Sequence, residues 1–191
     1  MKKRKLIFVI SSPSGGGKTT ICGMVLKKIP GLKRSVSVTS RQPRKGEKPN
    51  VDYYFVGKEE FLKKIKENAF AEWAKVLDNY YGTLKKNIER SWKQGRDVIL
   101  NIDIQGALRI KKVYSNETVL MFILPPSFRV LKERLVNRNT DGPDEIKKRL
   151  TLAKKELPYA QQYDYTVVND SLNKAVNEVE SIIVAERCKV R

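Results

Sequence analysis

Histidine is absent from this chain of 191 residues, and only two cysteines, Cys22 and Cys188, are present. Histidine is the commonest general base and a frequent metal ligand, so its absence excludes a histidine general base and a histidine metal ligand. The two cysteines have no metal-ligand spacing, which favours a reducing cytoplasm. No apolar run has the length of a membrane span, and the apolar stretch after the basic start is short for a signal peptide. We therefore expect a cytoplasmic protein without a membrane partner.

Acidic residues are scarce, with 21 Asp and Glu against 39 Lys and Arg, and the formal net charge is +18. Clustered basic residues are typical of nucleic-acid binders, so a nucleic-acid surface is one interpretation. However, stretches such as "KEEFLKKIKEN" mix acids and bases at helical spacing, which indicates solvated helix faces. We expect no dedicated nucleic-acid partner, although the positive charge will attract anionic nucleotides.

Four apolar runs predict buried strands: "KLIFVI", "DVILNI", "TVLMFIL" and "YTVV". Helical patterns alternate with them, for example "TTICGMVLKKI" and "SLNKAVNEVESIIVAERC". This alternation predicts an α/β fold with a central parallel sheet covered on both faces. The length favours one folding unit, whose core we place at residues 1–34, 84–126 and 163–191.

Two segments interrupt the alternation. Residues 35–83 contain short strand-like runs and one helix, which predicts a strand-rich lobe on the acceptor side. Residues 127–162 read as two helices joined by a polar turn, with Pro143 at the start of the second. The second segment has the form of a movable lid.

The stretch "SSPSGGGKTT", residues 11–20, nearly satisfies G-x-x-x-x-G-K-[ST], with Ser12 in place of the first glycine. It follows an apolar strand and opens a helix, which is the context of a phosphate-binding loop. We expect Lys18 to reach the β- and γ-phosphates of a nucleoside triphosphate and the Thr19 hydroxyl to be a ligand of Mg²⁺. The predicted triphosphate-binding residues of the loop are Ser12, Pro13, Ser14, Gly15, Gly16, Gly17, Lys18, Thr19 and Thr20. GTPases, ATPase motors and small-molecule kinases share such a loop, so the acceptor has to be sought elsewhere in the chain.

Two arginines, Arg41 and Arg44, flank a Gln-Pro pair, and Tyr53 follows in a strand-like run. Arginines held by a proline-stiffened turn can bind a phosphate through fork-like hydrogen bonds. The alternative is that they are ordinary solvated loop residues. On the residues alone, both interpretations remain open.

Glu72 stands among apolar and aromatic residues in "AEWAKV". It is either a surface residue on the polar side of a strand or a carboxylate held for a ligand with two donors. Guanine presents such a pair in N1–H and N2–H₂, whereas adenine does not. Hydroxyls of Ser37 and Thr83 could address the rest of the base, and Tyr81 could join Tyr53 on a phosphate.

The runs "SVSVTSRQPRKGEKPNVDYYFV", "AEWAKVLDNYYGT", "VILNIDIQGA", "FILPPS", "LKERLVNRNT" and "YTVVND" together resemble the guanylate kinase family, from about Leu6 to Glu186. The resemblance implies a P-loop core, an inserted GMP-binding lobe at residues 35–83 and a helical lid at residues 127–162. It implies phosphorylation of GMP, and of dGMP, by ATP with Mg²⁺ in purine nucleotide metabolism. The expected partners are these small molecules, and the expected assembly is a monomer or a homodimer.

Carried over by position, the resemblance assigns three groups of residues. Catalysis is assigned to Lys18, Arg41, Arg134, Arg138 and Arg149, and Asn169 is placed beside the adenine of ATP. GMP binding is assigned to Ser37, Arg41, Arg44, Tyr53, Glu72, Tyr81, Gly82, Thr83 and Asp103, with Asp103 also near Mg²⁺.

Two positions depart from the family pattern. Asn101 stands where an acid is common, and Asn139 replaces the usual glycine after a lid arginine. A non-catalytic, peptide-binding relative is the alternative within this family, although Lys18 and Thr19 of the loop favour an enzyme. Phosphoryl transfer also agrees with the lack of histidine, because it depends on alignment and charge neutralisation.

Overall fold

The computed structural model describes residues 5–44, 46–76, 78–137 and 142–190. Its larger sheet has five strands in the order β2-β7-β1-β8-β9. The pairs β2/β7 and β8/β9 are parallel, with Leu32 opposite Asp97 and Met121 opposite Tyr165. These strands are β1 (Ile7–Ser11), β2 (Leu32–Arg34), β7 (Asp97–Asn101), β8 (Thr118–Leu124) and β9 (Tyr165–Val168). The predicted α/β fold with a parallel sheet is confirmed.

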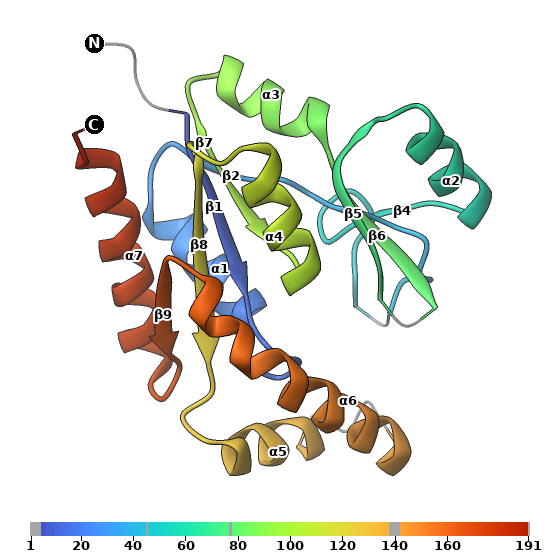
Figure 1. Ribbon diagram of the computed structural model, residues 1–191, viewed down its shortest axis with the longest axis vertical. Helices are drawn as coiled ribbons and strands as arrows, with labels where there is room; N and C mark the ends of the chain where they lie inside the picture. The colour runs from blue at the N-terminus through green and yellow to red at the C-terminus, as the bar shows by residue number, and fades with distance from the viewer. Residues whose placement is uncertain (1–4, 45, 77, 138–141, 191) are drawn as a thin grey trace. The chain divides into compact units, whose positions relative to one another are not determined.

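Helices separate the strands along the chain, as the alternating sequence pattern predicts (Figure 1). They are α1 (Lys18–Lys28), α3 (Lys85–Lys93), α4 (Ile104–Val113) and α7 (Leu172–Cys188). All five residues of β1 are buried, which explains why its sequence is apolar without alternation. Ile21 and Val25 of α1 are fully buried, one helical turn apart.

The chain divides into two compact units. The first comprises Met1–Ile7, Gly31–Leu100 and Gln105–Thr118, and the second comprises Phe8–Pro30, Asn101–Ile104 and Val119–Arg191. The division into core, lobe and lid made from the sequence stays a prediction.

The first unit contains a four-stranded sheet in the order β4-β3-β6-β5, with α2 (Lys58–Lys66) in the same segment. Phe61 of α2 is fully buried and stacks on Phe70 at 4.6 Å between ring centroids. Val38 and Leu84 complete this small core. The strands are β3 (Val38–Thr39), β4 (Tyr54–Phe55), β5 (Phe70–Val76) and β6 (Asn79–Leu84).

The second unit contains α5 (Phe128–Val136) and α6 (Pro143–Glu156), followed by the 3₁₀ helix η1 (Leu157–Gln162). Ser127 caps α5 by accepting a hydrogen bond from the backbone of Val130 at 3.2 Å. Pro143 occupies the first turn of α6, as predicted, where its missing N–H costs no helical bond. Leu131, Leu135 and Ala153 form the apolar contact of α5 and α6.

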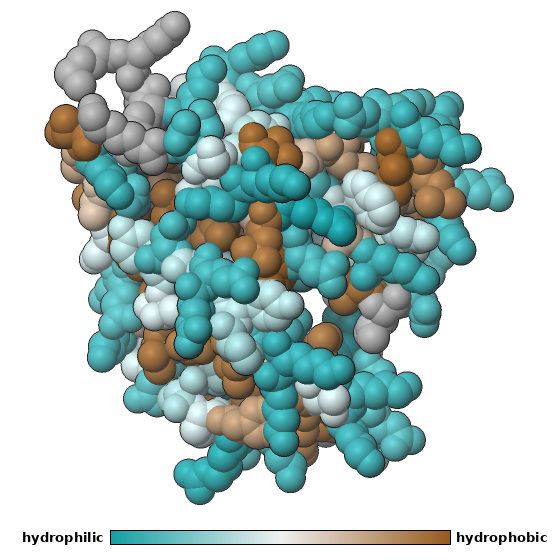
Figure 2. Space-filling view, in the orientation of Figure 1, coloured by the Kyte–Doolittle hydropathy of each residue, from teal (hydrophilic) through white to brown (hydrophobic). Residues whose placement is uncertain are grey.

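Sequence analysis missed β2, because this strand has only three residues and two of them are basic. Within the part of the chain that the structure describes, no helix is long and apolar enough to cross a membrane. Hydrophilic side chains cover most of the face seen in Figure 2, with hydrophobic groups scattered among them.

Candidate functional site

The glycine loop lies between β1 and α1 in the second unit, and its conformation needs glycine at two positions. Gly15 and Gly17 have φ angles of 93° and 94°, in the left-handed region that L side chains rarely adopt. A Cβ on Gly15 would lie 2.9 Å from Leu131 of α5, and one on Gly17 would overlap the Asn169 amide. The glycines therefore permit both the turn and the close approach of its neighbours.

The N-terminus of α1 begins directly after this loop. Gly17 is its N-cap, and no side chain among the described residues caps it. The first N–H groups of a helix have no intrahelical acceptor, and the helix dipole gives them partial positive charge. Lys18, half-buried in the first turn, adds a full positive charge there. This arrangement is suited to binding a phosphate chain.

Asn101, at the end of β7, lies against the predicted Mg²⁺ ligand. Its Nδ2 donates to Oγ1 of Thr19 at 3.2 Å, while its Oδ1 is buried without a hydrogen-bond partner among the described residues. A hydroxyl and an amide oxygen are oxygen ligands of the kind that Mg²⁺ accepts. No cluster of three Asp, Glu or Cys side chains able to hold a metal occurs in the described ranges. The residues therefore fit an Mg²⁺ that takes its remaining ligands from nucleotide phosphates and water.

Three predicted residues from the end of the chain contact the loop or each other within the second unit. Nη1 of Arg149 donates to Oγ of Ser14 at 2.9 Å, and Nδ2 of Asn169 donates to the Gly16 carbonyl at 2.9 Å. Nη2 of Arg134 donates to the Asn169 carbonyl at 2.9 Å. The structure thus brings two of the three predicted lid arginines to the phosphate loop and its contact Asn169.

Glu156, at the end of α6, was not identified from the sequence. It accepts a hydrogen bond from the Ser14 backbone, and burial together with the nearby charge of Asp103 raises its pKa to about 7, against the opposing effect of Lys18. Its Oε2 is buried and has no hydrogen-bond partner among the described residues. Burial also raises the pKa of Tyr163, on which Asp103 and Glu156 act as well. Asp103 therefore belongs to the phosphate-loop group in this unit.

The acceptor candidates lie in the first unit, where Glu72 of β5 is opposite Thr83 of β6. Oγ1 of Thr83 donates to Oε1 of Glu72 at 2.6 Å, and the two residues are 0% and 5% exposed, respectively. Ser37 is also buried and directly precedes β3, which pairs with β6. The alternative of an exposed strand glutamate is therefore excluded.

The guanidinium of Arg41 lies over the ring of Tyr53, 5.6 Å from its centroid. The rings of Tyr53 and Tyr81 are 6.0 Å apart, edge to face, and the Tyr81 hydroxyl hydrogen-bonds Arg41. Three of the four predicted phosphate ligands are thus together, and the side chain of Arg44 is exposed nearby in the same loop. Sequence analysis missed Glu47, which forms an ion pair with Arg41 at 2.7 Å.

Three further positions singled out from the sequence are Gly82, Arg138 and Asn139. Gly82 has a packing reason to be glycine, because a Cβ there would lie 2.8 Å from the Phe70 ring. Arg138 and Asn139 lie outside the described residues.

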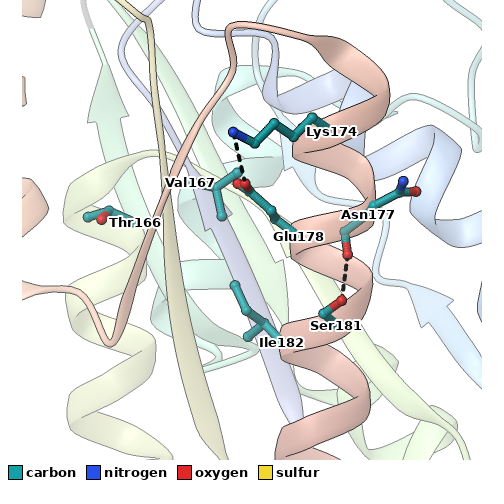
Figure 3. Close-up of a pocket in the computed structure, with 7 residues that line it drawn as sticks. All are labelled: Thr166, Val167, Lys174, Asn177, Glu178, Ser181 and Ile182. Atoms are coloured by element: carbon teal, nitrogen blue, oxygen red, sulfur yellow. Dashed lines mark hydrogen bonds and ion pairs between the residues drawn. The ribbon is translucent and has the colours of Figure 1, made fainter.

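A groove of about 610 Å³ lies along β9 and α7 (Figure 3). Lys174 pairs with Glu178 at 3.9 Å, and Ser181 donates to the Asn177 carbonyl at 2.9 Å. The side chain of Asn177 accepts a hydrogen bond from Nζ of Lys28 of α1 at 2.9 Å, and none of the predicted site residues lines the groove. Its lining residues are Thr166, Val167, Lys174, Asn177, Glu178, Ser181 and Ile182.

The parallel sheet and the glycine loop between its strand β1 and helix α1 define a P-loop nucleotide-binding protein. The sequence profile of one such family, guanylate kinase, matches residues 3–186. The chain belongs to the guanylate kinase family.

Proteins similar to this chain match it over nearly its whole length. The chain is 48% identical to a guanylate kinase of Caldanaerobacter subterraneus subsp. tengcongensis over 190 residues, covering 100% of this chain and 92% of the relative. It is 46% identical to a guanylate kinase of Rickettsia felis, covering 99% of this chain and 98% of the relative. The crystal structure of guanylate kinase from Anaplasma phagocytophilum is similar with a TM-score of 0.83 and 35% identity, covering 100% of this chain and 90% of that one.

Proposed function

We propose that this protein is an enzyme that transfers the γ-phosphoryl group of ATP to GMP, giving ADP and GDP. The observation that carries this function is the buried carboxylate of Glu72, held by Thr83 at 2.6 Å in the same lobe as Arg41, Tyr53 and Tyr81. A buried carboxylate is costly unless donors surround it, and guanine brings two donors on one edge. The arginine and the two tyrosines are suited to the 5′-phosphate of the same nucleotide.

The donor side of the reaction is assigned to the second unit. The loop N–H groups and Lys18 bind the ATP phosphates, with Arg134 and Arg149 adding positive charge beside them. We assign Mg²⁺ to Thr19, with Asn101 as its neighbour, because the buried Oδ1 of Asn101 is suited to an oxygen-ligated cation. When bound, Mg²⁺ neutralises charge on the transferring phosphates. Asn169, next to the loop, is assigned to the adenine.

No general base is required on the acceptor. The attacking oxygen of GMP belongs to a phosphate that is already ionised at neutral pH, so no proton has to be removed. The protein has to align two anionic phosphate chains, neutralise their repulsion and exclude water, which would otherwise accept the phosphoryl group. This explains how a chain without histidine performs the reaction.

A coupled assay with Mg·ATP and a panel of acceptors tests the function. We expect turnover with GMP, slower or similar turnover with dGMP, and almost none with AMP, CMP, UMP or dTMP. Equal rates with GMP and AMP, or no turnover with any acceptor, would contradict the proposal.

The alternative of a non-catalytic, peptide-binding relative has no support from the relatives, and the loop residues Lys18 and Thr19 are present. We further propose a cytoplasmic location and no dedicated nucleic-acid partner. Binding to a generic DNA duplex at a series of salt concentrations tests the second point. Tight binding that persists at physiological salt would contradict it.

A further inference from the structure

Glu47 forms a close ion pair with Arg41 in the acceptor lobe. Nη2 of Arg41 lies 2.7 Å from Oε1 and 2.9 Å from Oε2 of Glu47, and the two side chains are only 13% and 21% exposed. The helix-surface pair Lys64–Glu60 in the same unit is longer, at 3.1 Å, and more exposed. The Arg41–Glu47 pair is therefore a fixed contact rather than a solvated surface pair.

The same carboxylate also holds the second arginine of the loop. Oε2 of Glu47 accepts a hydrogen bond from the backbone N–H of Arg44 at 2.8 Å, and the Glu47 N–H donates to the Arg44 carbonyl at 3.0 Å. Although partial burial acts in the opposite direction, hydrogen bonds from Arg41 and Arg44 hold the pKa of Glu47 below its usual value. The carboxylate is thus ionised at neutral pH and ties both arginines to one turn.

The remaining contacts of Arg41 leave part of its donor fork for a ligand. Both carboxylate oxygens lie on the same nitrogen, Nη2, while Nη1 donates to the Gln42 carbonyl at 2.6 Å. The Tyr81 hydroxyl is a further hydrogen-bond partner of Arg41, and the Tyr53 and Phe55 rings lie 5.6 Å and 6.0 Å from the guanidinium. A guanidinium has five N–H donors in a rigid plane, so Glu47 fixes the orientation of the plane without using all of it.

We infer that Glu47 is a positioning residue for the GMP phosphate, which orients the side chain of Arg41 and the backbone of Arg44 and stays in place when GMP binds. The inference rests on the proposed function. The competing account is that Glu47 occupies the position of the phosphate and is displaced by it. Displacement would break the contact with Arg41 and the contact with the Arg44 backbone together. Retention leaves a loop of net positive charge, because one carboxylate faces two arginines.

The two accounts predict opposite changes in KM for GMP when Glu47 is substituted. In Glu47→Gln and Glu47→Ala, loss of the orienting charge should raise KM for GMP by roughly ten- to a hundredfold, with a smaller change in kcat and no change in KM for ATP. If Glu47 instead competes with the phosphate for Arg41, its removal would free the arginine for GMP, and KM for GMP would fall. Glu60→Gln, on the exposed face of α2, is the matched control and should leave all constants unchanged.

Binding of guanosine separates positioning from a general loss of structure. Guanosine keeps the base and lacks the phosphate, so its inhibition constant should be the same in wild type and Glu47→Gln, while the dissociation constant for GMP rises. Equal weakening of both ligands, or no weakening of GMP, would overturn the inference. If the wild type neither binds nor phosphorylates GMP, the proposed function itself fails, which is a different outcome.

Discussion

Oγ1 of Thr83 lies 2.6 Å from Oε1 of Glu72, across the pairing of β5 and β6, and both side chains are buried. A carboxylate in such a place retains its charge at an acceptable cost only if donors address it. The four-stranded sheet therefore contains a buried acceptor, and we propose that its ligand is a group with several N–H donors.

Removal of the Thr83 hydroxyl should lower the stability of the protein, because the buried carboxylate of Glu72 loses a hydrogen-bond donor. Thr83→Val keeps the shape but leaves Glu72 without this donor, so the free energy of unfolding should fall by about 1–3 kcal/mol. Denaturant unfolding measures it. Thr151→Val is the control, because that hydroxyl bonds the Lys147 carbonyl on the exposed face of α6, and its effect should be within about 0.5 kcal/mol. Equal effects of the two substitutions would show that the buried pair has no special energetic role.

Lys18→Ala should abolish most of the transfer and leave the fold intact. In the proposed mechanism the lysine stabilises charge on the phosphates and does not fill the core, so its loss should cost about 2–4 kcal/mol in the transition state, which is a loss of roughly thirty- to a thousandfold in kcat. Steady-state kinetics measures this loss, and circular dichroism checks the fold. Lys27→Ala, in the last turn of the same helix, should behave as wild type. Near-normal turnover of Lys18→Ala would remove the loop from the mechanism.

Asn101→Asp should lower the Mg²⁺ concentration that nucleotide binding requires. A carboxylate beside Thr19 adds a negative charge to an oxygen site, which should tighten the binding of Mg²⁺ by on the order of tenfold. In the absence of Mg²⁺, the same charge should weaken the binding of ATP, because it repels the phosphates. Titration of ATP binding at several Mg²⁺ concentrations measures both effects without turnover. Asn177→Asp, on the exposed face of α7, is the control, and an unchanged Mg²⁺ dependence in Asn101→Asp would place the metal elsewhere.

Glu156 should make the nucleotide-free protein less stable as the pH rises. Burial, together with the charge of Asp103, raises its pKa to about 7 from an ordinary value of 4.5. Between these values the folded state binds more protons than the unfolded state, so the contribution is complete below 4.5 and is lost as the pH rises through 7.

Comparison of wild type with Glu156→Gln at pH 5 and pH 8 isolates this effect. The wild type should lose about 1–2 kcal/mol more unfolding free energy than Glu156→Gln over the interval, after allowance for partial exposure. Glu133→Gln, on the exposed face of α5, should keep the wild-type pH dependence. Parallel curves for wild type and Glu156→Gln would contradict the assignment.

The sequence predicted the elements of the fold well where a pattern repeats. The strands of the larger sheet other than β2 were expected as apolar runs, and the helices between them as periodic patterns, because burial on two faces or on one leaves such patterns. β2 was missed because its three residues, two of them basic, are too few to form a recognisable hydrophobic pattern. Its membership in the sheet is decided by pairing with β7.

The candidate site was predicted unevenly, for a physical reason. The glycine loop has a local signature, and Glu72 stands out as an acid in an apolar run. Glu47 and Glu156 have no such signature, because each depends on a partner that folding brings close, namely Arg41 and the Ser14 backbone. A charged residue in a loop or at the end of an amphipathic helix looks like an ordinary surface residue until that partner is known.

The central claim is that Glu72 selects guanine. Adenine would place an unprotonated N1 against the carboxylate, and hydrogen-bonding sites reject such mismatches by roughly 10⁴-fold. Glu72→Gln keeps the shape but replaces one acceptor by a donor. The decisive measurement is the ratio of kcat/KM for GMP to that for AMP, in wild type and in Glu72→Gln, with Mg·ATP binding as the internal control. The account predicts a ratio of about 10⁴ in the wild type, a large fall in the variant through loss of GMP efficiency, and unchanged ATP binding. A variant that keeps the wild-type preference for GMP would contradict it.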